Sequence, residues 1–223
     1  MFTIAMIGQK GGGGKTTTGT GLAVQAAKSG LASLIIDLDP QANAANWKDR
    51  REVDNPAVVS AHVSRLQPTL DAARQHGADF VVIDTPAKSD SAAIEAARAA
   101  DLVLIPVWPQ IYHYEGLTAL QDLLRVAGNV PAYIVLNGLH HQATIQADKA
   151  KALVKDIYHF PVCPVHLCDR GIYADAPALG KSAQEVDPQG GAADELERLY
   201  VFVLQHLKGV RHGKPENLAT SGE

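Results

Sequence analysis

A glycine-rich run near the start of the chain constrains its fold more than any other feature. The run is Gly8-Gln9-Lys10-Gly11-Gly12-Gly13-Gly14-Lys15-Thr16-Thr17-Thr18. It follows an apolar stretch, residues 2–7, and leads into residues 19–29, where apolar side chains recur at helical spacing. Strand, glycine-rich turn and helix in this order form phosphate-binding loops, because glycines let the backbone aim N–H groups at an anion that the helix N-terminus also attracts. The run predicts a site for a nucleoside triphosphate.

Individual residues of the run have separate predicted roles. The backbone of residues 11–14 surrounds the phosphates, the ammonium group of Lys15 contacts the β- and γ-phosphates, and the hydroxyl of Thr16 is a ligand for Mg²⁺. The usual pattern opens with a glycine, but this chain has Gln9 at that place and a second lysine, Lys10, directly after it. The alternative interpretation is a flexible turn that carries two exposed lysines.

Two apolar stretches end in acidic residues. Residues 32–36 run into Asp37-Leu38-Asp39, and residues 79–83 run into Asp84. Because ligands of α/β sheets bind outside the carboxyl ends of the strands, these carboxylates should face the same crevice as the glycine-rich run. An acid after a buried strand is what the magnesium site of a phosphate-loop enzyme requires, so Asp84 is predicted to hold a Mg²⁺-bound water. For Asp37 and Asp39, solvation of the strand end and capping of a helix over 42–51 is an equal alternative.

The rest of the chain alternates apolar stretches with helical patterns. Strands are predicted over 102–107, 132–137 and 162–167, with a possible strand over 57–59, and helices over 68–76, 89–100, 115–127, 143–158 and 191–208. This alternation predicts an α/β fold, a single domain with a mostly parallel, doubly wound sheet and helices on both faces. The domain is expected to span residues 1–208, and the polar residues 209–223 are expected to form a disordered tail.

Asn137, at the end of the strand over 132–137, has two interpretations. Its amide offers a donor and an acceptor, which suits the edge of adenine. The alternative is a loop residue that starts the turn at Gly138.

The composition excludes several classes of protein. No apolar run approaches the roughly 20 residues of a membrane-spanning helix, and no secretory signal is visible. The two cysteines, Cys163 and Cys168, exclude a disulfide framework and are expected to be core thiols in a reducing cytosol. The net charge of −4 gives nucleic-acid binding no support beyond a local basic patch.

The motifs, taken in order, resemble the ParA/MinD family of deviant Walker-motif ATPases. The likeness is closer to the ParA proteins that partition plasmids and chromosomes, through Gln9 and through the two runs Asp37-Leu38-Asp39-Pro40-Gln41-Ala42-Asn43 and Asp175-Ala176-Pro177-Ala178-Leu179-Gly180. It points to the short forms that lack an N-terminal helix-turn-helix domain. The resemblance implies a P-loop NTPase fold, ATP and Mg²⁺ as cofactors, slow ATP hydrolysis and a homodimer that forms on ATP binding.

The resemblance also implies roles for single residues. Thr17 would contact the α-phosphate, Lys10 would reach the phosphates bound by the partner subunit, and Asp39 would position the attacking water. Asp37 would support the metal shell, and Asn137 would read adenine beneath the loop over 168–177. Two departures from the family pattern are Gly13, where a larger residue is common, and Cys168-Asp169-Arg170, where the family has Pro-Arg-Asn.

Partners follow from the same resemblance. The ATP-bound dimer would bind DNA without sequence specificity, a centromere-binding adaptor would stimulate hydrolysis, and the protein would be cytoplasmic, nucleoid-associated when ATP is bound, and not bound to a membrane. The candidate contacts to DNA phosphates are Arg170, Lys181, Arg198, Lys208 and Arg211. Alternatives are an ATPase that positions a protein cargo, a MinD-like membrane-surface switch that uses the helix over 194–211, and a metabolic enzyme that spends ATP in amide or ligase chemistry.

Overall fold

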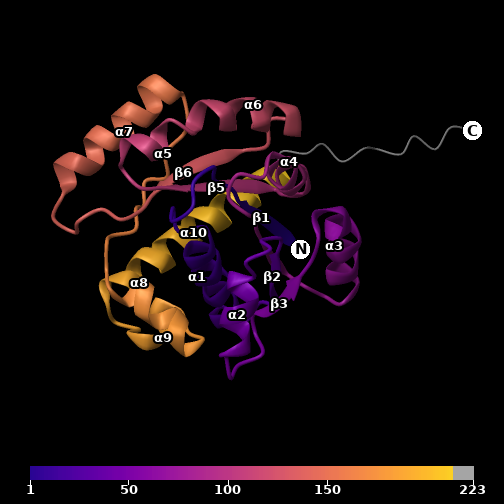
Figure 1. Cartoon of the computed structure of the whole chain (residues 1–223). Coiled ribbons are helices and arrows are strands. Elements are labelled where there is room, and N and C mark those ends of the chain that lie inside the picture. Colours follow the sequence, from indigo (N-terminus) through magenta and orange to yellow (C-terminus); the bar gives the residue numbers. More distant parts are fainter. Residues whose placement is uncertain (213–223) are drawn as a thin grey trace, which may run out of the picture.

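The computed structural model describes residues 1–212, which form a layered α/β domain (Figure 1). Its centre is a six-stranded sheet of order β3-β2-β4-β1-β5-β6, in which every neighbouring pair is parallel. The strands are β1 (Phe2–Met6), β2 (Ser33–Asp37), β3 (Ala57–Ser60), β4 (Phe80–Asp84), β5 (Leu102–Val107) and β6 (Ala132–Leu136). The predicted single-domain, doubly wound parallel sheet is confirmed. Residues 213–223, most of the expected tail, lie outside the described residues.

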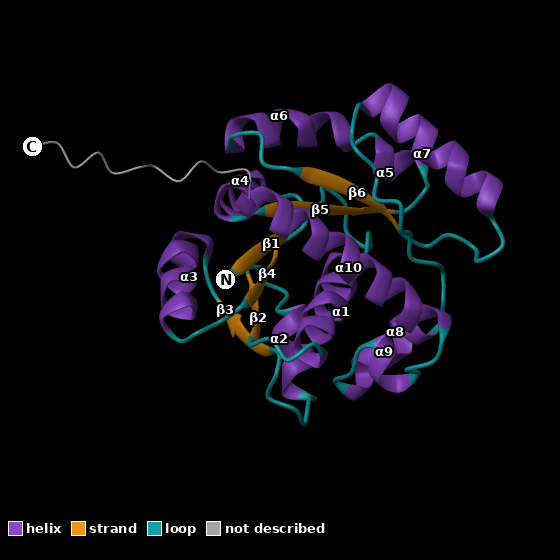
Figure 2. Cartoon of the chain, turned by 180° about the vertical axis from the view of Figure 1, so that it is seen from behind, coloured by secondary structure: helices purple, strands orange, loops and turns teal. Residues whose placement is uncertain are grey.

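Helices bury both faces of the sheet (Figure 2), which explains why the inner strands are continuous apolar runs. One face packs against α3 (Leu66–Gln75), α4 (Asp90–Ala99), α6 (Leu117–Ala127) and α7 (Thr144–Tyr158). The other packs against α1 (Lys15–Lys28), α2 (Asn43–Asp49), α9 (Ala183–Val186) and α10 (Gly191–His212). The shorter elements are η1 (Val63–Arg65), α5 (Ile111–Tyr114), α8 (Ile172–Asp175) and η2 (Ala176–Leu179).

The register of the sheet brings the predicted acidic residues together. Asp84, the last residue of β4, pairs in register with Met6 of β1 on one side and with Asp37 of β2 on the other. The carboxyl ends of these three strands therefore open on one crevice, next to the loop that joins β1 to α1. Among residues 1–212, no helix is both long and apolar enough to cross a membrane.

Several predicted elements differ from those observed. The strand expected over 162–167 is wrong: only isolated bridges form there, from Val162 to Ile134 and from Cys168 to Leu139, because Pro161 and Pro164 lack the N–H groups that a ladder needs. The helix expected over 115–127 starts two residues later, as α6 at Leu117, and α5 is a short helix before it that was not predicted. The last helix continues to His212, beyond the expected end at 208.

Both cysteines are buried and unpaired, as expected for core thiols. Burial raises the pKa of Cys163 to about 12 and that of Cys168 to about 11. Since the thiolate is the reactive form of cysteine, both side chains are inert at neutral pH.

Candidate functional site

The glycine-rich loop has a backbone that only glycine adopts without strain at two positions. Gly12 has φ of 78° and Gly14, the residue before α1, has φ of 94°. A Cβ atom on Gly14 would lie 2.1 Å from the side-chain nitrogen of Asn137, and one on Gly13 would lie 2.9 Å from the carbonyl oxygen of Pro106. Pro106 of β5 and Asn137, which directly follows β6, thus lie against the loop, and a side chain at position 13 would require a neighbouring group to move.

Lys15 is the buried cation of the loop. Its side chain belongs to the first residue of α1, is only 8% exposed, and forms no ion pair with any residue of the described range 1–212. Burial lowers the pKa of its ammonium group, and the charges of Asp84 and Asp39 partly restore it. A cation that is removed from water without a directly bound counterion, beside the start of a helix, is poised to receive an anion.

Thr16 and Asp84 form the predicted metal-binding pair. The hydroxyl of Thr16 donates a hydrogen bond of 2.6 Å to Oδ2 of Asp84, whose side chain is almost fully buried. The other oxygen, Oδ1, has no hydrogen-bond partner among the described residues. Burial raises the pKa of Asp84 to about 7, with the hydrogen bond from Thr16 acting in the opposite direction. A hydroxyl and a carboxylate with an unused oxygen suit Mg²⁺, which takes one or two protein oxygens and fills its shell with water and phosphate.

Asp37 uses both of its carboxylate oxygens on backbone groups. Oδ1 accepts the N–H of Asp39 at 3.0 Å, and Oδ2 accepts the N–H groups of Ala44 and Ala45 at 3.0 and 3.1 Å. The buried carboxylate therefore caps the first turn of α2, which matches the capping alternative for this residue. Its charge also raises the pKa of the neighbouring Asp84, so Asp37 acts on the metal-binding pair from one strand away.

Asp39 and Lys10 lie at the rim of the site. Oδ1 of Asp39 accepts the N–H of Gln41, and the residue lines the same cavity as the loop. Lys10 is exposed and forms no ion pair with another described residue. Burial lowers the pKa of His113, whose ring lies beside Gly13, and the positive charges of Lys10 and Lys15 lower it further. Lys10 is therefore near the loop and free to contact an anion.

Two cavities meet at the loop. The larger one, about 450 Å³, is lined by residues 11–17, Thr20, Asp39, Gln41, Asn43, Trp47, Arg50, Pro86, Ala87 and Pro177. The smaller one, about 250 Å³, is lined by Gly12, Gly14, Thr17, Trp108, Asn137, Gly138, residues 167–170, Tyr173 and Ala174. The first contains Lys15 and Thr16, so it suits the phosphates, and we call it the phosphate cavity. The second contains Asn137 and suits a base.

Asn137 is partly committed to the loop. Its amide nitrogen donates to the carbonyl oxygen of Gly13 at 3.1 Å, and its amide oxygen accepts the N–H of Gly138 at 2.9 Å. It therefore supports the phosphate-binding backbone while it faces the base cavity, and its role in reading adenine stays a prediction.

Glu195 of α10 accepts hydrogen bonds from the segment over 168–173, which lines the base cavity. The Cys168 N–H donates to this buried carboxylate at 3.0 Å, the guanidinium of Arg170 donates two bonds of 2.9 and 2.8 Å, and the hydroxyl of Tyr173 donates one of 3.0 Å. Burial, followed by the charge of Glu195, raises the pKa of Tyr173. Arg170 is thus tied to Glu195.

The other candidate contacts to DNA are not held by a buried carboxylate as Arg170 is. Arg198 pairs with Asp194 at 3.3 Å between exposed side chains, a contact of little energetic weight. Lys181 and Lys208 are exposed, and Arg211 belongs to the last turn of α10.

Sequence reasoning missed Trp47, Arg50 and Trp108, which line the two cavities. The first two lie on or directly after α2, the helix that Asp37 caps, and Trp108 directly follows β5. The sequence signal that could have identified them is their position. Trp108 directly follows a buried strand, and Trp47 and Arg50 belong to the helical segment that follows another, and ligands of such sheets bind at the carboxyl ends of strands.

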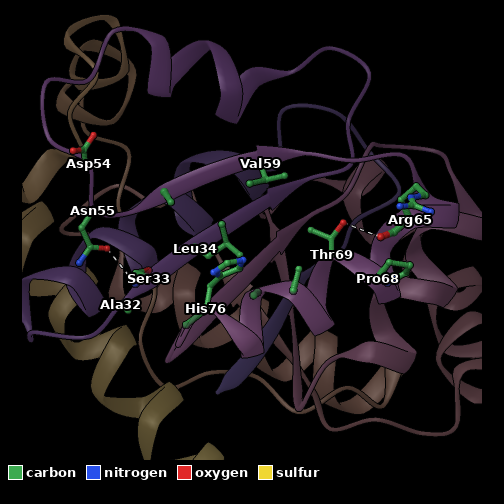
Figure 3. Close-up of a pocket in the computed structure, with 14 residues that line it drawn as sticks. Ala32, Ser33, Leu34, Asp54, Asn55, Val59, Arg65, Pro68, Thr69 and His76 are labelled. Atoms are coloured by element: carbon green, nitrogen blue, oxygen red, sulfur yellow. Dashed lines mark hydrogen bonds between the residues drawn. The ribbon is translucent and has the colours of Figure 1, made fainter.

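A third cavity, about 660 Å³, lies away from the loop at the β3 edge of the sheet (Figure 3). Leu34 and Val59 form its floor, with Pro68, Thr69 and His76 of the α3 region along one side. Asp54 and Asn55 lie at one end and Arg65 at the other. We call this cavity the β3 groove.

Comparisons with known proteins agree with this geometry. The model of the family described as the CobQ/CobB/MinD/ParA nucleotide binding domain matches residues 4–209. The chain is 30% identical to the chromosome-partitioning ATPase Soj of Thermus thermophilus, over 92% of this chain and 96% of that protein. It is 29% identical to the maintenance of carboxysome distribution protein A of Halothiobacillus neapolitanus, over 91% of this chain and 96% of that protein. The solved structure of the septum site-determining protein MinD complexed with Mg-ADP from Pyrococcus horikoshii has a TM-score of 0.73 at 19% identity, and the match covers 91% of this chain and 95% of that one.

Proposed function

Because the chain belongs to the CobQ/CobB/MinD/ParA nucleotide-binding family, we propose that it is a dimerising ATPase switch for the partition of DNA. The observation that carries the proposal is the pair Thr16–Asp84 beside Lys15: a hydroxyl, a buried carboxylate with an unused oxygen and a buried, unpaired cation. The similarity to a chromosome-partitioning ATPase over most of both chains supports the choice of cargo.

Each residue of the site has one task in hydrolysis. The N–H groups of residues 11–14 and the ammonium group of Lys15 bind and orient the phosphates, which is most of what phosphoryl transfer needs. Thr16 and Asp84 would hold Mg²⁺, which would neutralise charge on the β- and γ-phosphates. Asp39, at the rim of the phosphate cavity, orients the attacking water.

Lys10 acts on the nucleotide of the partner subunit. It is exposed and has no counterion among the described residues, so it is available across a dimer interface. A cation supplied in trans is worth about 10³–10⁵ in rate in related chemistry. Lys10→Ala should therefore abolish stimulated hydrolysis and ATP-dependent dimerisation, measured by phosphate release and light scattering. Unchanged dimerisation together with unchanged stimulated turnover would contradict the trans role.

The partners in this proposal are non-specific DNA, bound by the ATP dimer, and a centromere-binding adaptor, which stimulates hydrolysis. The test is ATP turnover with and without DNA and with the protein encoded by the neighbouring gene. Binding through phosphates should weaken steeply between 50 and 200 mM salt, on the order of 10³-fold or more for several contacts. Retention on DNA that does not depend on ATP or on salt would count against partition.

A second candidate is an ATPase that positions a protein assembly on the same DNA matrix. The observation in its favour is the 29% identity to a maintenance of carboxysome distribution protein. The neighbour-encoded protein separates the two candidates: binding of that protein to a DNA site favours partition, and its binding to a protein assembly favours positioning.

A membrane-surface switch gets less support. Leu196, Leu199 and Val203 of α10 are buried in the core beneath the sheet, so these apolar side chains are not available to a bilayer. Co-sedimentation with anionic liposomes would contradict this.

A further inference from the structure

Arg50 is a second cation at the wall of the phosphate cavity. It directly follows α2, whereas Lys15 begins α1, so the two cations reach the cavity from different elements. Arg50 has an exposed side chain and forms no ion pair among residues 1–212. A guanidinium that lines a phosphate-binding cavity without a carboxylate partner can donate two hydrogen bonds to phosphate oxygens in a bidentate arrangement.

The neighbouring Arg51 shows how a structural arginine differs in this fold. Both of its terminal nitrogens donate to Glu185 at 2.8 Å, and its guanidinium lies over the ring of Trp47, 4.8 Å from the ring centroid. Its charge is therefore compensated within the chain. Arg50, one residue away, uses a single nitrogen on the protein, Nε, which donates to the carbonyl oxygen of Pro177 at 3.0 Å.

The lining of its cavity favours the phosphates over the base as ligands of Arg50. Arg50 shares its cavity with Lys15, Thr16 and Asp39, the residues of the metal and γ-phosphate end. It does not line the cavity that contains Asn137.

Arg50 is also linked to η2, which follows the residues that line the base cavity in sequence. Its bond to Pro177 joins α2 to η2, and Trp47 adds a second link, since its indole N–H donates to the carbonyl oxygen of Lys181 at 3.0 Å. At this junction a Cβ on Gly180 would lie 2.4 Å from the backbone of Arg50, so the two segments are in direct contact. A ligand that fixes the Arg50 guanidinium therefore also fixes η2, which continues the segment over the base cavity.

We propose that the terminal nitrogens of Arg50 bind the γ-phosphate of the bound nucleotide, while its Nε keeps η2 in place. Arg50 thereby makes the site discriminate a nucleoside triphosphate from a diphosphate. The inference rests on the proposed function, because it requires a nucleotide on the loop.

The test compares binding of ATP and ADP, each with Mg²⁺, to the full chain by calorimetry. Arg50→Ala should weaken ATP binding by about tenfold to a hundredfold, the range for a hydrogen bond to a charged group, and ADP binding by less than about threefold. Arg50→Lys, which keeps the charge, should lose less. The matched control is Arg65→Ala: Arg65 is also exposed and without an ion pair among the described residues, but it lies in the β3 groove.

Two results would overturn the inference, and a third would overturn the proposed function. Equal ATP affinity of the parent and Arg50→Ala would show that the guanidinium does not reach the phosphate. An equal loss of affinity for ATP and ADP in Arg50→Ala would show that the side chain only supports the fold. Arg50→Gln tests this separately, because it retains an N–H donor for Pro177 and should still lose affinity for ATP but not for ADP. A parent protein that binds neither nucleotide would instead overturn the proposed function itself.

Discussion

The phosphate cavity and the β3 groove differ in what their walls leave unsatisfied. The groove is larger, about 660 Å³ against about 450 Å³, and its floor consists of apolar side chains. The phosphate cavity contains a buried ammonium group without an ion pair in the described chain, and its wall includes Thr16, which donates a hydrogen bond to Asp84. The groove is lined by Ser33, whose buried neutral hydroxyl also lacks a partner among the described residues. Because burying an unpaired charge costs far more free energy than burying a neutral hydroxyl, the lysine indicates a ligand more strongly than the serine or the cavity volume does.

The position of the groove follows from the way helices cover the edge of the sheet. On its face of the sheet, α3 packs over the inner strands, and β3 is an edge strand that pairs only with β2. Leu34 keeps 8% of its surface exposed, and Val59 keeps 44%. The groove therefore marks the place where helical cover ends, whereas the phosphate cavity marks the place where three strands end and α1 begins.

The largest expected difference between the two regions is in catalysis. Lys15→Ala should reduce kcat for ATP by at least about 10²–10³, the cost of one lost electrostatic contact to a transition state. Lys155→Ala, on the exposed face of α7, is the matched control and should leave turnover unchanged. Phosphate release measures both. Turnover of the Lys15 variant within a few-fold of the parent would remove the loop lysine from the mechanism.

Asp84→Asn should separate activity from stability. In the metal-free protein, burial raises the pKa of Asp84 to about 7, and the unfolded chain titrates near 3.9. The contribution of the protonated form to stability is thus fully present below about pH 4 and is lost as the pH rises through about 7. The variant removes the buried charge, so in EDTA at pH 8 we expect it to be more stable than the parent, by roughly 1.4 kcal/mol for each pKa unit.

Urea unfolding with EDTA at pH 5.5 and pH 8 measures this advantage, which should shrink at the lower pH. ATP turnover with Mg²⁺ should be lost in the same variant. A variant that is less stable than the parent at both pH values would show that the carboxylate stabilises the fold without a metal.

The smallest effect is expected in the β3 groove. Val59→Lys replaces an exposed side chain on an edge strand, so the free energy of unfolding should change by no more than about 0.5 kcal/mol and ATP turnover should stay the same. Val126→Lys, an exposed position on α6, is the control. A change of turnover in the Val59 variant alone would connect the groove to the phosphate cavity.

Local patterns determined the fold class and the centre of the site. Apolar runs that alternate with helical periodicity predicted the parallel sheet, and the glycine-rich run predicted a phosphate-binding loop, in which Gly12 and Gly14 have positive φ. These features depend on neighbours in sequence. The pairing of Thr16 with Asp84, 68 residues apart, also followed from the rule that strand ends share one crevice.

Only the tertiary structure decided which polar side chains already have hydrogen-bond or ion-pair partners within the chain. Asp37 caps α2, Arg170 pairs with Glu195, and Asn137 bonds to the loop 124 residues before it. The same packing leaves Arg50 without a carboxylate partner in the described chain and places it in the phosphate cavity. These outcomes depend on contacts between distant segments, which the identity of a residue and the pattern around it do not specify.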